Sequence, residues 1–320
     1  MAKVAILDDY QNVARDLADW SVLPADCEIV VFNDYLAGVA PMAERLADFD
    51  IVGIMRERTP FPRALFEKLP KLKLLVTTGA RNASVDLAAA ADHGVVVCGT
   101  GGSAQATAEL AWGLILGLMR RIPFEDRAMR DGGWQTTLGH DLSGKTLGIL
   151  GLGRLGSQVA KIGIAFGMDV VGWSKNLTAE RAAECGAARA HSLDDLLRAA
   201  DVISIHLVLS DRTRDLIGAR EFGLMKPTAY LINTSRGPII NEAALVDAMQ
   251  RGTIAGAALD VYDTEPLPAD HRLRGLENTV LTPHIGYVTE TTYRVFYTEM
   301  VEDIAAYLAG EPIRVIAPKG

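Results

Sequence analysis

The sequence predicts an α/β protein built from two parallel-sheet domains. Short runs rich in β-branched residues alternate with apolar-periodic helical segments from end to end, which is typical of βαβ units. The strand pattern restarts after a long apolar helix near the middle of the chain. A length of 320 residues, of which 49% are hydrophobic, also suits about two domains of ordinary size.

The first series of strands lies in the N-terminal third. The pattern predicts strands at residues 4–7, 28–32, 51–55, 73–77 and 95–98, with a helix at 62–69 among the connections. Residues 107–122, TAELAWGLILGLMRRI, are apolar on almost every face, as expected of a helix buried between domains or subunits. We expect this helix to carry the chain into the second domain.

The second series begins at TLGILG and continues through DVVGW, DVISIHL, TAYLINTS, IAGAALDV and TVLTPH. After it, apolar residues recur at helical spacing from Val295 to Leu308. Thr289 is placed as an N-cap and Gly310 as a stop signal. We expect this helix to return to the first domain. The predicted division is therefore a discontinuous domain of residues 1–102 and 288–320, and a second domain of residues 103–287.

Composition excludes several classes of protein. A formal net charge of −8 gives no basic field for nucleic acid or an anionic membrane. Cys27, Cys98 and Cys185 are widely separated, so neither a disulfide framework nor a cysteine zinc site is indicated. The N-terminus enters a strand within three residues and resembles no export signal, and the longest apolar run is too short to span a bilayer. We expect a cytoplasmic protein.

A glycine-rich motif opens the second series. Gly151, Gly153 and Gly156 have GxGxxG spacing, follow the strand TLGIL and precede an apolar helix. Such glycines permit a tight turn, let backbone approach a pyrophosphate and let the helix pack closely on the strand. This context predicts a dinucleotide on the helix N-terminus, and hence a Rossmann domain.

The stretch GWSKN, residues 172–176, lies about 20 residues farther on. An acid at this distance would bind the ribose 2′-hydroxyl of NAD, but the chain has Ser174 and Lys175 there. A hydroxyl and a cationic point charge suit a 2′-phosphate. The sequence therefore favours NADP(H) over NAD(H) as cofactor, and an exposed Lys175 with NAD bound is the alternative.

Three charged side chains are expected to face one crevice. Arg236, Glu265 and His284 follow predicted strands, whose carboxyl ends line the ligand crevice of an open α/β sheet. A guanidinium can hold a carboxylate at two points, an imidazole can protonate a carbonyl oxygen, and a carboxylate favours the charged imidazole. The set suits 2-oxo acid chemistry. His206 ends a strand and is expected to line the cofactor crevice, and no spacing indicates a metal site.

The chain resembles the D-isomer-specific 2-hydroxyacid dehydrogenases over nearly its whole length. The motifs that carry the resemblance are TTGARNASVD (77–86), TAEL (107–110), GKTLGILGLGRLG (144–156), ISIHLVLSDRT (203–213), LINTSRGPIINEAAL (231–245), ALDVYDTEP (258–266) and TPHIG (282–286). The resemblance implies a Rossmann domain at 103–287 inserted in a flavodoxin-like substrate domain. It also implies a homodimer formed through the helix after Thr107.

The resemblance assigns roles to individual residues. It makes Arg236 the ligand of the substrate carboxylate and carbonyl, His284 the acid or base, and Glu265 its support. Its implied cofactor contacts are Thr107, Arg154, Leu155, Thr213, Thr234 and Asp260, and its substrate contacts are the backbone N–H groups of Thr78, Gly79 and Ala80. The chain departs from the family pattern at Arg81 and Asn82. With Arg56, Arg81 suits a substrate that has a second anionic or hydroxylated end.

The expected function is a reductase that passes a hydride from NAD(P)H to a small 2-oxo acid of the glyoxylate or hydroxypyruvate class. Phosphoglycerate or phosphite oxidation within the same family is an alternative, because the Arg–Glu–His set is shared. The alternative of another class is a dinucleotide-sensing protein without catalysis.

Overall fold

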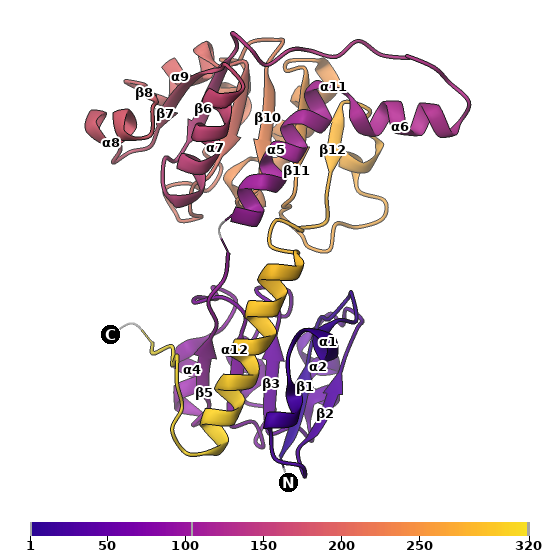
Figure 1. Cartoon of the computed structure of the whole chain (residues 1–320), viewed down its shortest axis with the longest axis vertical. Coiled ribbons are helices and arrows are strands. Elements are labelled where there is room, and N and C mark those ends of the chain that lie inside the picture. The colour runs from indigo at the N-terminus through magenta and orange to yellow at the C-terminus, as the bar shows by residue number, and fades with distance from the viewer. Residues whose placement is uncertain (1, 104, 319–320) are drawn as a thin grey trace. The chain divides into compact units, whose positions relative to one another are not determined.

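The computed structural model describes residues 2–103 and 105–318, and the chain divides into two compact units. Unit 1 consists of Met1–Ser103 and Val288–Gly320, and unit 2 of Ala104–Tyr287. Unit 1 is indigo to purple with one yellow helix in Figure 1, and unit 2 runs from magenta to orange. Each unit has its own parallel sheet, so the predicted α/β class with two parallel-sheet domains is confirmed.

Unit 1 contains a five-stranded sheet in the order β2-β1-β3-β4-β5. This is the flavodoxin-like order. The strands are β1 (Lys3–Ile6), β2 (Glu28–Val31), β3 (Ile51–Ile54), β4 (Leu74–Thr77) and β5 (Val96–Gly99). They lie within one residue or so of the predicted positions. Strands β3 and β4 are buried at every position, as expected for a sheet covered on both faces.

The helices of unit 1 are mostly short. They are α1 (Ala14–Leu17), η1 (Trp20–Val22), α2 (Val39–Leu46), α3 (Arg63–Phe66), α4 (Leu87–Asp92) and α12 (Glu290–Leu308). The helix predicted at 62–69 is shorter than expected, because only residues 63–66 are α-helical. After Phe66, the chain continues in turns, in which for example the Leu69 N–H donates a hydrogen bond to the Phe66 carbonyl.

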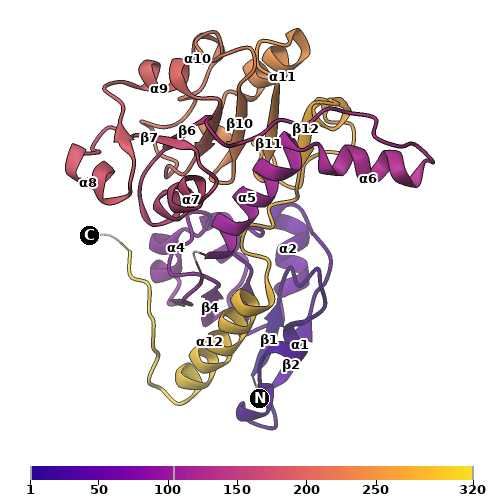
Figure 2. The same cartoon turned by 45° about the horizontal axis from the view of Figure 1, so that its top comes forward.

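The last helix, α12, belongs to unit 1. Thr289 caps α12 by accepting a hydrogen bond from the Thr292 N–H, and Gly310 follows the helix in the left-handed conformation at φ 84°. Tyr297, Met300 and Ile304 are buried on its inner side. In Figures 1 and 2 the helix lies along the strands of this unit.

Unit 2 contains a seven-stranded sheet in the order β12-β11-β10-β9-β6-β7-β8. The order reverses between β6 and β9, as in a Rossmann fold. The strands are β6 (Thr146–Leu150), β7 (Asp169–Trp173), β8 (Ala188–Arg189), β9 (Val202–Ile205), β10 (Tyr230–Asn233), β11 (Gly256–Leu259) and β12 (Thr279–Leu281). The two-residue strand β8 was not predicted.

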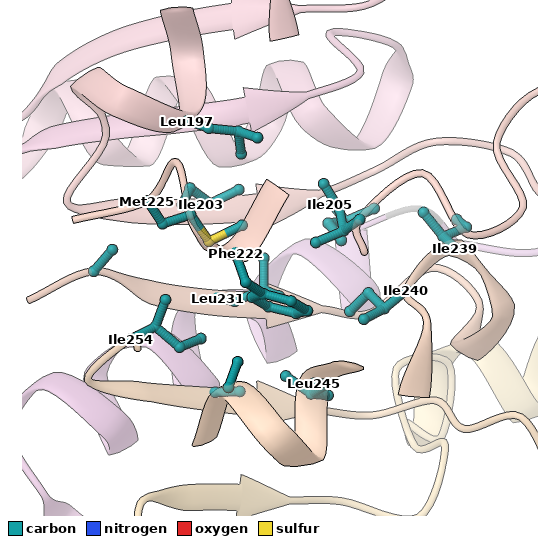
Figure 3. Packing of buried hydrophobic residues seen from close by; sticks show 14 of the residues in the cluster. Leu197, Ile203, Ile205, Phe222, Met225, Leu231, Ile239, Ile240, Leu245 and Ile254 are labelled. Carbon is teal, nitrogen blue, oxygen red and sulfur yellow. The ribbon is translucent and has the colours of Figure 1, made fainter. Parts of the chain in front are cut away.

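The helices of unit 2 cover both faces of its sheet. They are α5 (Gln105–Met119), α6 (Ile122–Arg130), α7 (Arg154–Ala165), α8 (Ala179–Glu184), α9 (Leu193–Ala199), α10 (Ala219–Phe222) and α11 (Glu242–Arg251), with 3-10 turns η2 (Gly237–Ile239) and η3 (Arg272–Gly275). On one face, Phe222 and Met225 pack with Ile203 of β9 and Leu231 of β10 (Figure 3). Burial of these side chains fixes the strands that carry the site.

The apolar helix of the sequence differs from its prediction. It spans residues 105–119 rather than 107–122, because Arg121 adopts the left-handed conformation at φ 55° and starts α6 in a new direction. Helix α6 was not predicted. None of its residues is buried, and Ile122 and Met129 are more than half exposed. Within unit 2 it projects from the end of α5 (Figure 2).

The C-terminal tail closes one edge of the unit 1 sheet. Val315 forms an antiparallel bridge with Cys98, and the Ile316 N–H donates to the Val97 carbonyl, so the tail covers the edge strand β5. Arg314 anchors this tail. Its Nε lies 2.9 Å from Oδ1 of Asp303, a carboxyl with 0% exposure, and its Nη2 lies 2.6 Å from Glu302.

Among the residues that the structure describes, no helix combines the length and the apolar character needed to cross a membrane.

Because Asp303 pairs with Arg314, we expect the stability that is lost in the Arg314→Leu variant to depend on pH. Burial raises the pKa of Asp303 from 3.8 to about 6. The folded state therefore binds this proton more tightly than the unfolded chain, and the free energy of unfolding falls as pH rises through that window. Without Arg314, the ionised carboxyl loses its partner. We expect urea unfolding to show a loss of about 2 to 3 kcal/mol at pH 8 and a smaller loss at pH 5.

Arg294→Leu is the matched control, because Arg294 pairs with Glu290 on the exposed side of the same helix. Its loss is expected to be below about 0.5 kcal/mol at both pH values. Equal losses for Arg314→Leu at pH 5 and pH 8 would contradict the role of Asp303.

Candidate active site

The candidate site of unit 2 lies at the carboxyl ends of its parallel strands. The glycine motif follows β6, and His206 follows β9, so the two flank the point at which the strand order reverses. Ligands of open α/β sheets bind at such switch points. Arg236 follows β10, Asp260 follows β11 and His284 follows β12. The sheet thus brings residues from five strand ends to one edge.

The glycine motif has the geometry of a phosphate-binding turn. Gly151 has φ 100°, which a side chain would strain, and a Cβ on Gly156 would lie 1.9 Å from the Gly151 carbonyl oxygen. Gly153 differs, because a Cβ there would meet no described atom within 4 Å. Open space therefore lies beside Gly153 at the N-terminus of α7, where a pyrophosphate is bound in such turns.

The stretch with Ser174 and Lys175 is fixed beside this turn by a backbone hydrogen bond. The Gly151 N–H donates to the Trp173 carbonyl over 2.8 Å. Ser174 is half-buried and Lys175 is exposed. Within residues 2–103 and 105–318, Lys175 has neither an ion pair nor a hydrogen bond through its ammonium group. The ammonium group is thus available to an anion.

Two buried polar atoms on this edge have no protein partner. The Nδ1 of His206 and the Oγ1 of Thr234 are buried and make no hydrogen bond to any described residue. The Nε2 of His206 lies 2.8 Å from the Ser204 hydroxyl. Burial lowers the pKa of His206 to about 4, so its imidazole is neutral near pH 7. Unpaired buried polar atoms fit a site that a polar cofactor completes.

Three further residues assigned to the cofactor differ from His206 and Thr234, because none of them has a buried polar atom without a partner. Arg154 is exposed and Leu155 half-buried in the first turn of α7. The Thr213 hydroxyl donates to the Val208 carbonyl over 2.7 Å and accepts from the Ser210 N–H over 2.8 Å. It therefore shapes the loop after β9.

Asp260 organises the segment that carries His284. Its Oδ1 accepts hydrogen bonds from the Thr282 hydroxyl at 2.6 Å and the Ile285 N–H at 2.8 Å, and its Oδ2 accepts from the Gly286 N–H at 2.9 Å. Burial raises the pKa of Asp260, while these bonds lower it. The Thr107 hydroxyl donates to the Gly286 carbonyl over 3.0 Å. Thr107 and Asp260, both of which the resemblance assigns to the cofactor, thus contact the same loop.

His284 and Glu265 form a hydrogen-bonded pair. Nδ1 of His284 lies 2.5 Å from Oε2 of Glu265, and the two side chains are 23% and 34% exposed. The other carboxylate oxygen of Glu265 accepts the Tyr262 N–H at 2.9 Å. No described residue is within hydrogen-bond reach of Nε2 of His284, so this atom is left for a ligand. The pairing expected from the sequence is thus present.

Arg236 is half-buried after β10 and precedes η2. Its carbonyl accepts a hydrogen bond from the Asn233 side chain at 2.9 Å, and its guanidinium donates to the Ser235 carbonyl at 2.7 Å. The next residue packs tightly on the Glu265 segment, because a Cβ on Gly237 would lie 2.0 Å from the Tyr262 carbonyl carbon. The segment of Arg236 is thereby fixed against the segment of Glu265.

The substrate loop predicted in unit 1 follows β4, and two of its three N–H groups form hydrogen bonds within unit 1. The Thr78 N–H donates to the Ile54 carbonyl over 3.0 Å, and the Gly79 N–H donates to the Thr100 hydroxyl over 2.8 Å. These two N–H groups are therefore engaged within unit 1. Ala80 is exposed, and its N–H has no partner among the residues that the structure describes.

Arg56 crosses this loop of unit 1. It has φ 52°. Its Nη1 lies 1.7 Å from the position that a Cβ on Gly79 would occupy. Nη1 donates to the Thr78 carbonyl over 3.2 Å, and Nε lies 3.7 Å from Glu57. Arg81 is exposed and has no hydrogen bond or ion pair in the described chain. Asn82, a departure from the family pattern, donates to the Arg56 carbonyl over 2.6 Å and so holds the loop.

Sequence reasoning overlooked Tyr262. The residue lies inside the quoted motif ALDVYDTEP, but a tyrosine in an apolar strand end carries no signal of a polar contact. Its hydroxyl lies 2.9 Å from the Thr282 carbonyl and 3.1 Å from the Leu259 carbonyl.

In the described residues, no group of three or more His, Cys, Asp or Glu side chains is placed to hold a metal ion.

A family model described as the NAD-binding domain of D-isomer-specific 2-hydroxyacid dehydrogenases matches residues 112–286. This range contains the glycine motif, Arg236, Glu265 and His284. The chain belongs to this family. The predicted family is thereby confirmed. The predicted class of enzyme, a nicotinamide-dinucleotide-dependent oxidoreductase acting on a CH–OH group, is confirmed as well.

Curated relatives and solved structures agree with the family. The chain is 42% identical to a glyoxylate reductase of Aeropyrum pernix over 77% of this chain and 76% of that protein. It is 32% identical to a hydroxypyruvate reductase of Blautia hydrogenotrophica over 98% of this chain and 99% of that protein. It is 37% identical to a D-3-phosphoglycerate dehydrogenase of Methanocaldococcus jannaschii over 84% of this chain, but spans only 52% of that protein.

Among solved structures, a phosphoglycerate oxidoreductase of Vibrio cholerae superposes with a TM-score of 0.93 at 37% identity. The match covers 97% of this chain and 100% of that chain.

Replacement of Gly153 and of Gly156 by Ala should have opposite effects on folding and cofactor binding. Gly153→Ala meets open space, so we expect an unchanged thermal midpoint without ligand but a smaller rise on addition of NADH or NADPH, because the Cβ occupies the phosphate space. Gly156→Ala meets backbone, so we expect a loss of about 2 to 3 kcal/mol without ligand. A wild-type response of Gly153→Ala to cofactor would contradict this placement of the phosphates.

Proposed function

We propose that this protein is a reductase that converts a small 2-oxo acid of the glyoxylate or hydroxypyruvate class to the D-2-hydroxy acid, with NADPH preferred to NADH. The observation that carries the proposal is the His284–Glu265 pair, whose Nδ1 contact leaves Nε2 to exchange a proton. Histidine held in this way is a general acid and base in many enzymes.

The chain's own residues divide the work of reduction. When bound, the reduced nicotinamide supplies the hydride that adds to the keto carbon. His284 gives its Nε2 proton to the carbonyl oxygen as the C=O bond becomes a C–O–H group, and Glu265 stabilises the charged imidazole before the transfer. Arg236 holds the substrate carboxylate and carbonyl, which positions the keto carbon and stabilises charge on the oxygen.

The cofactor contacts proposed in unit 2 are the glycine turn and the unpaired polar atoms of its strand ends. Gly151, Gly153, Arg154, Leu155 and Gly156 would hold the pyrophosphate side. Thr107, Thr234 and Asp260 would form the nicotinamide side, with His206 and Thr213 along the crevice. The orphaned Oγ1 of Thr234 and Nδ1 of His206 support this assignment.

Unit 1 is proposed to bind an anionic end of the substrate. The Ala80 N–H is available there, whereas Thr78 and Gly79 serve to shape the loop. Arg56 and Arg81 add positive charge beside this N–H. This charge supports an acid with a second polar or anionic end, such as hydroxypyruvate or a phosphorylated acid, in preference to glyoxylate.

The preference for NADPH is proposed from the stretch beside the glycine turn. Ser174 and Lys175 stand where an acid would bind the ribose 2′-hydroxyl of NAD, and the Lys175 ammonium group has no partner in the described chain. A 2′-phosphate would accept hydrogen bonds from both side chains.

We further propose a homodimer formed through α5 and α6. Helix α6 buries none of its residues, and Trp134 and Leu138 in the following segment are 72% and 87% exposed. Apolar residues gathered in this way mark an interaction surface, and a second copy would cover them.

The three free cysteines support the reducing cytoplasm as the proposed location of the protein.

Steady-state rates should show the cofactor preference and the role of Lys175. With glyoxylate, hydroxypyruvate, pyruvate and phenylpyruvate as substrates, we expect a higher kcat/KM for NADPH than for NADH, and hydroxypyruvate as a better substrate than glyoxylate. Lys175→Ala should lower kcat/KM for NADPH about 3- to 10-fold and leave that for NADH unchanged, since one exposed ion pair is lost.

Lys161→Ala is the control for this variant, because Lys161 is exposed on α7, away from GWSKN. It should change neither cofactor's kcat/KM. An NADH preference in the wild type, or equal effects of the two lysine variants, would contradict the proposed 2′-phosphate site.

His284→Ala separates the enzyme from a protein that only senses dinucleotides. Loss of the proton donor should lower kcat about 10²- to 10⁴-fold, while the Kd for NADPH, measured by fluorescence titration, stays within about threefold. His191→Ala, at an exposed position of the same unit, should match the wild type. Full turnover by His284→Ala would refute the proposed acid.

A further inference from the structure

Tyr262 contacts each of the three segments that carry Arg236, Glu265 and His284. Its N–H donates to Oε1 of Glu265 over 2.9 Å. Its carbonyl group is packed so closely on Gly237 that a Cβ there would lie within 2.2 Å of the carbonyl atoms. Its hydroxyl lies 2.9 Å from the carbonyl of Thr282, two residues before His284. The side chain is 7% exposed.

The hydroxyl acts on a backbone that is held in an unfavourable conformation. His284 has φ 54°, in the left-handed region that residues with a Cβ seldom adopt. Such conformations persist where neighbouring groups fix them. The Thr282 carbonyl accepts both the His284 N–H at 3.1 Å and the Tyr262 hydroxyl at 2.9 Å. The hydroxyl therefore fixes the same carbonyl that holds the turn at His284.

Asp260 fixes the other side of this turn through the Ile285 and Gly286 N–H groups. The segment from 260 to 262 thus holds the segment from 282 to 286 before and after His284. The direction of the His284 side chain follows the backbone of this turn, and its Nδ1 lies 2.5 Å from Glu265.

We infer that the Tyr262 hydroxyl is a positioning group for the catalytic pair: it holds the Thr282–His284 turn so that Nδ1 of His284 stays on Glu265 and Nε2 is aimed at the substrate. This inference rests on the proposed function of His284. Tyr262 contacts no substrate or cofactor in this scheme, and it acts through His284 alone.

Tyr262→Phe tests the inference by removing one oxygen atom from a buried ring. We expect kcat to fall about 10- to 100-fold while the KM and Kd for NADPH stay within about threefold, because a displaced acid slows chemistry without affecting cofactor binding. In a His284→Ala background the same change should cause no further loss, because the two residues act as one unit.

Tyr230→Phe is the matched control. Tyr230 is also 7% exposed and lies at the start of β10, at the opposite end of the strand from Arg236. It should leave kcat unchanged. A kcat for Tyr262→Phe within twofold of the wild type, or a further loss in the His284→Ala background, would overturn the inference.

The ring N–H proton of His284 provides a reading that does not depend on turnover. In the wild type its NMR signal should lie far downfield because of the hydrogen bond to Glu265, and a His284→Gln spectrum would assign it. Loss or upfield movement of this signal in Tyr262→Phe supports the inference, and an unchanged signal overturns it. Absence of turnover by the wild type with every acid would refute the proposed function, while this signal would still decide the role of Tyr262.

Discussion

The parallel direction of the strands is the constraint on which the rest of the structure depends. In a parallel sheet every carboxyl end lies at the same edge, so residues that are far apart in sequence meet there. The glycine turn after β6, His206 after β9, Arg236 after β10 and Asp260 after β11 are examples. In unit 1 the loops after β3 and β4 meet in the same way, which brings Arg56 onto Gly79. The chemistry is therefore placed by strand order rather than by any single loop.

The buried carboxyl of Asp260 shows how the site obtains rigidity. Burial of a charged carboxylate is unfavourable, and it is tolerated only where hydrogen bonds replace water. Asp260 has three such donors, all from residues 282–286. Any movement of that segment would leave a buried carboxylate without donors, at a cost of about 1 to 3 kcal/mol for each lost bond. The left-handed turn at His284 is thus held by the same interaction that makes Asp260 tolerable in the interior.

The sequence predicted those features that rest on local pattern. Helix α12 was predicted because Thr289, an apolar repeat and Gly310 are all local signals, and the strands of both sheets were predicted from buried β-branched runs. Helix α6 was not, because it buries no residue and so has no apolar repeat aimed at a core. The use of the Gly79 N–H could not be predicted either. Its partner, Thr100, lies 21 residues away and becomes a neighbour only through β4 and β5.

The exposed position of Lys175 limits the binding energy that its single charge can contribute to the choice of cofactor. The bond between the Gly151 N–H and the Trp173 carbonyl fixes the backbone just before Ser174, and it involves neither the side chain of Ser174 nor that of Lys175. An exposed lysine contributes at most about 1 kcal/mol to an ion pair in water. Such an energy corresponds to less than a tenfold preference. In the proposed preference for NADPH, the larger contribution would come from the absent acid, because a carboxylate at this place would repel a 2′-phosphate and would accept a hydrogen bond from the ribose hydroxyl of NAD.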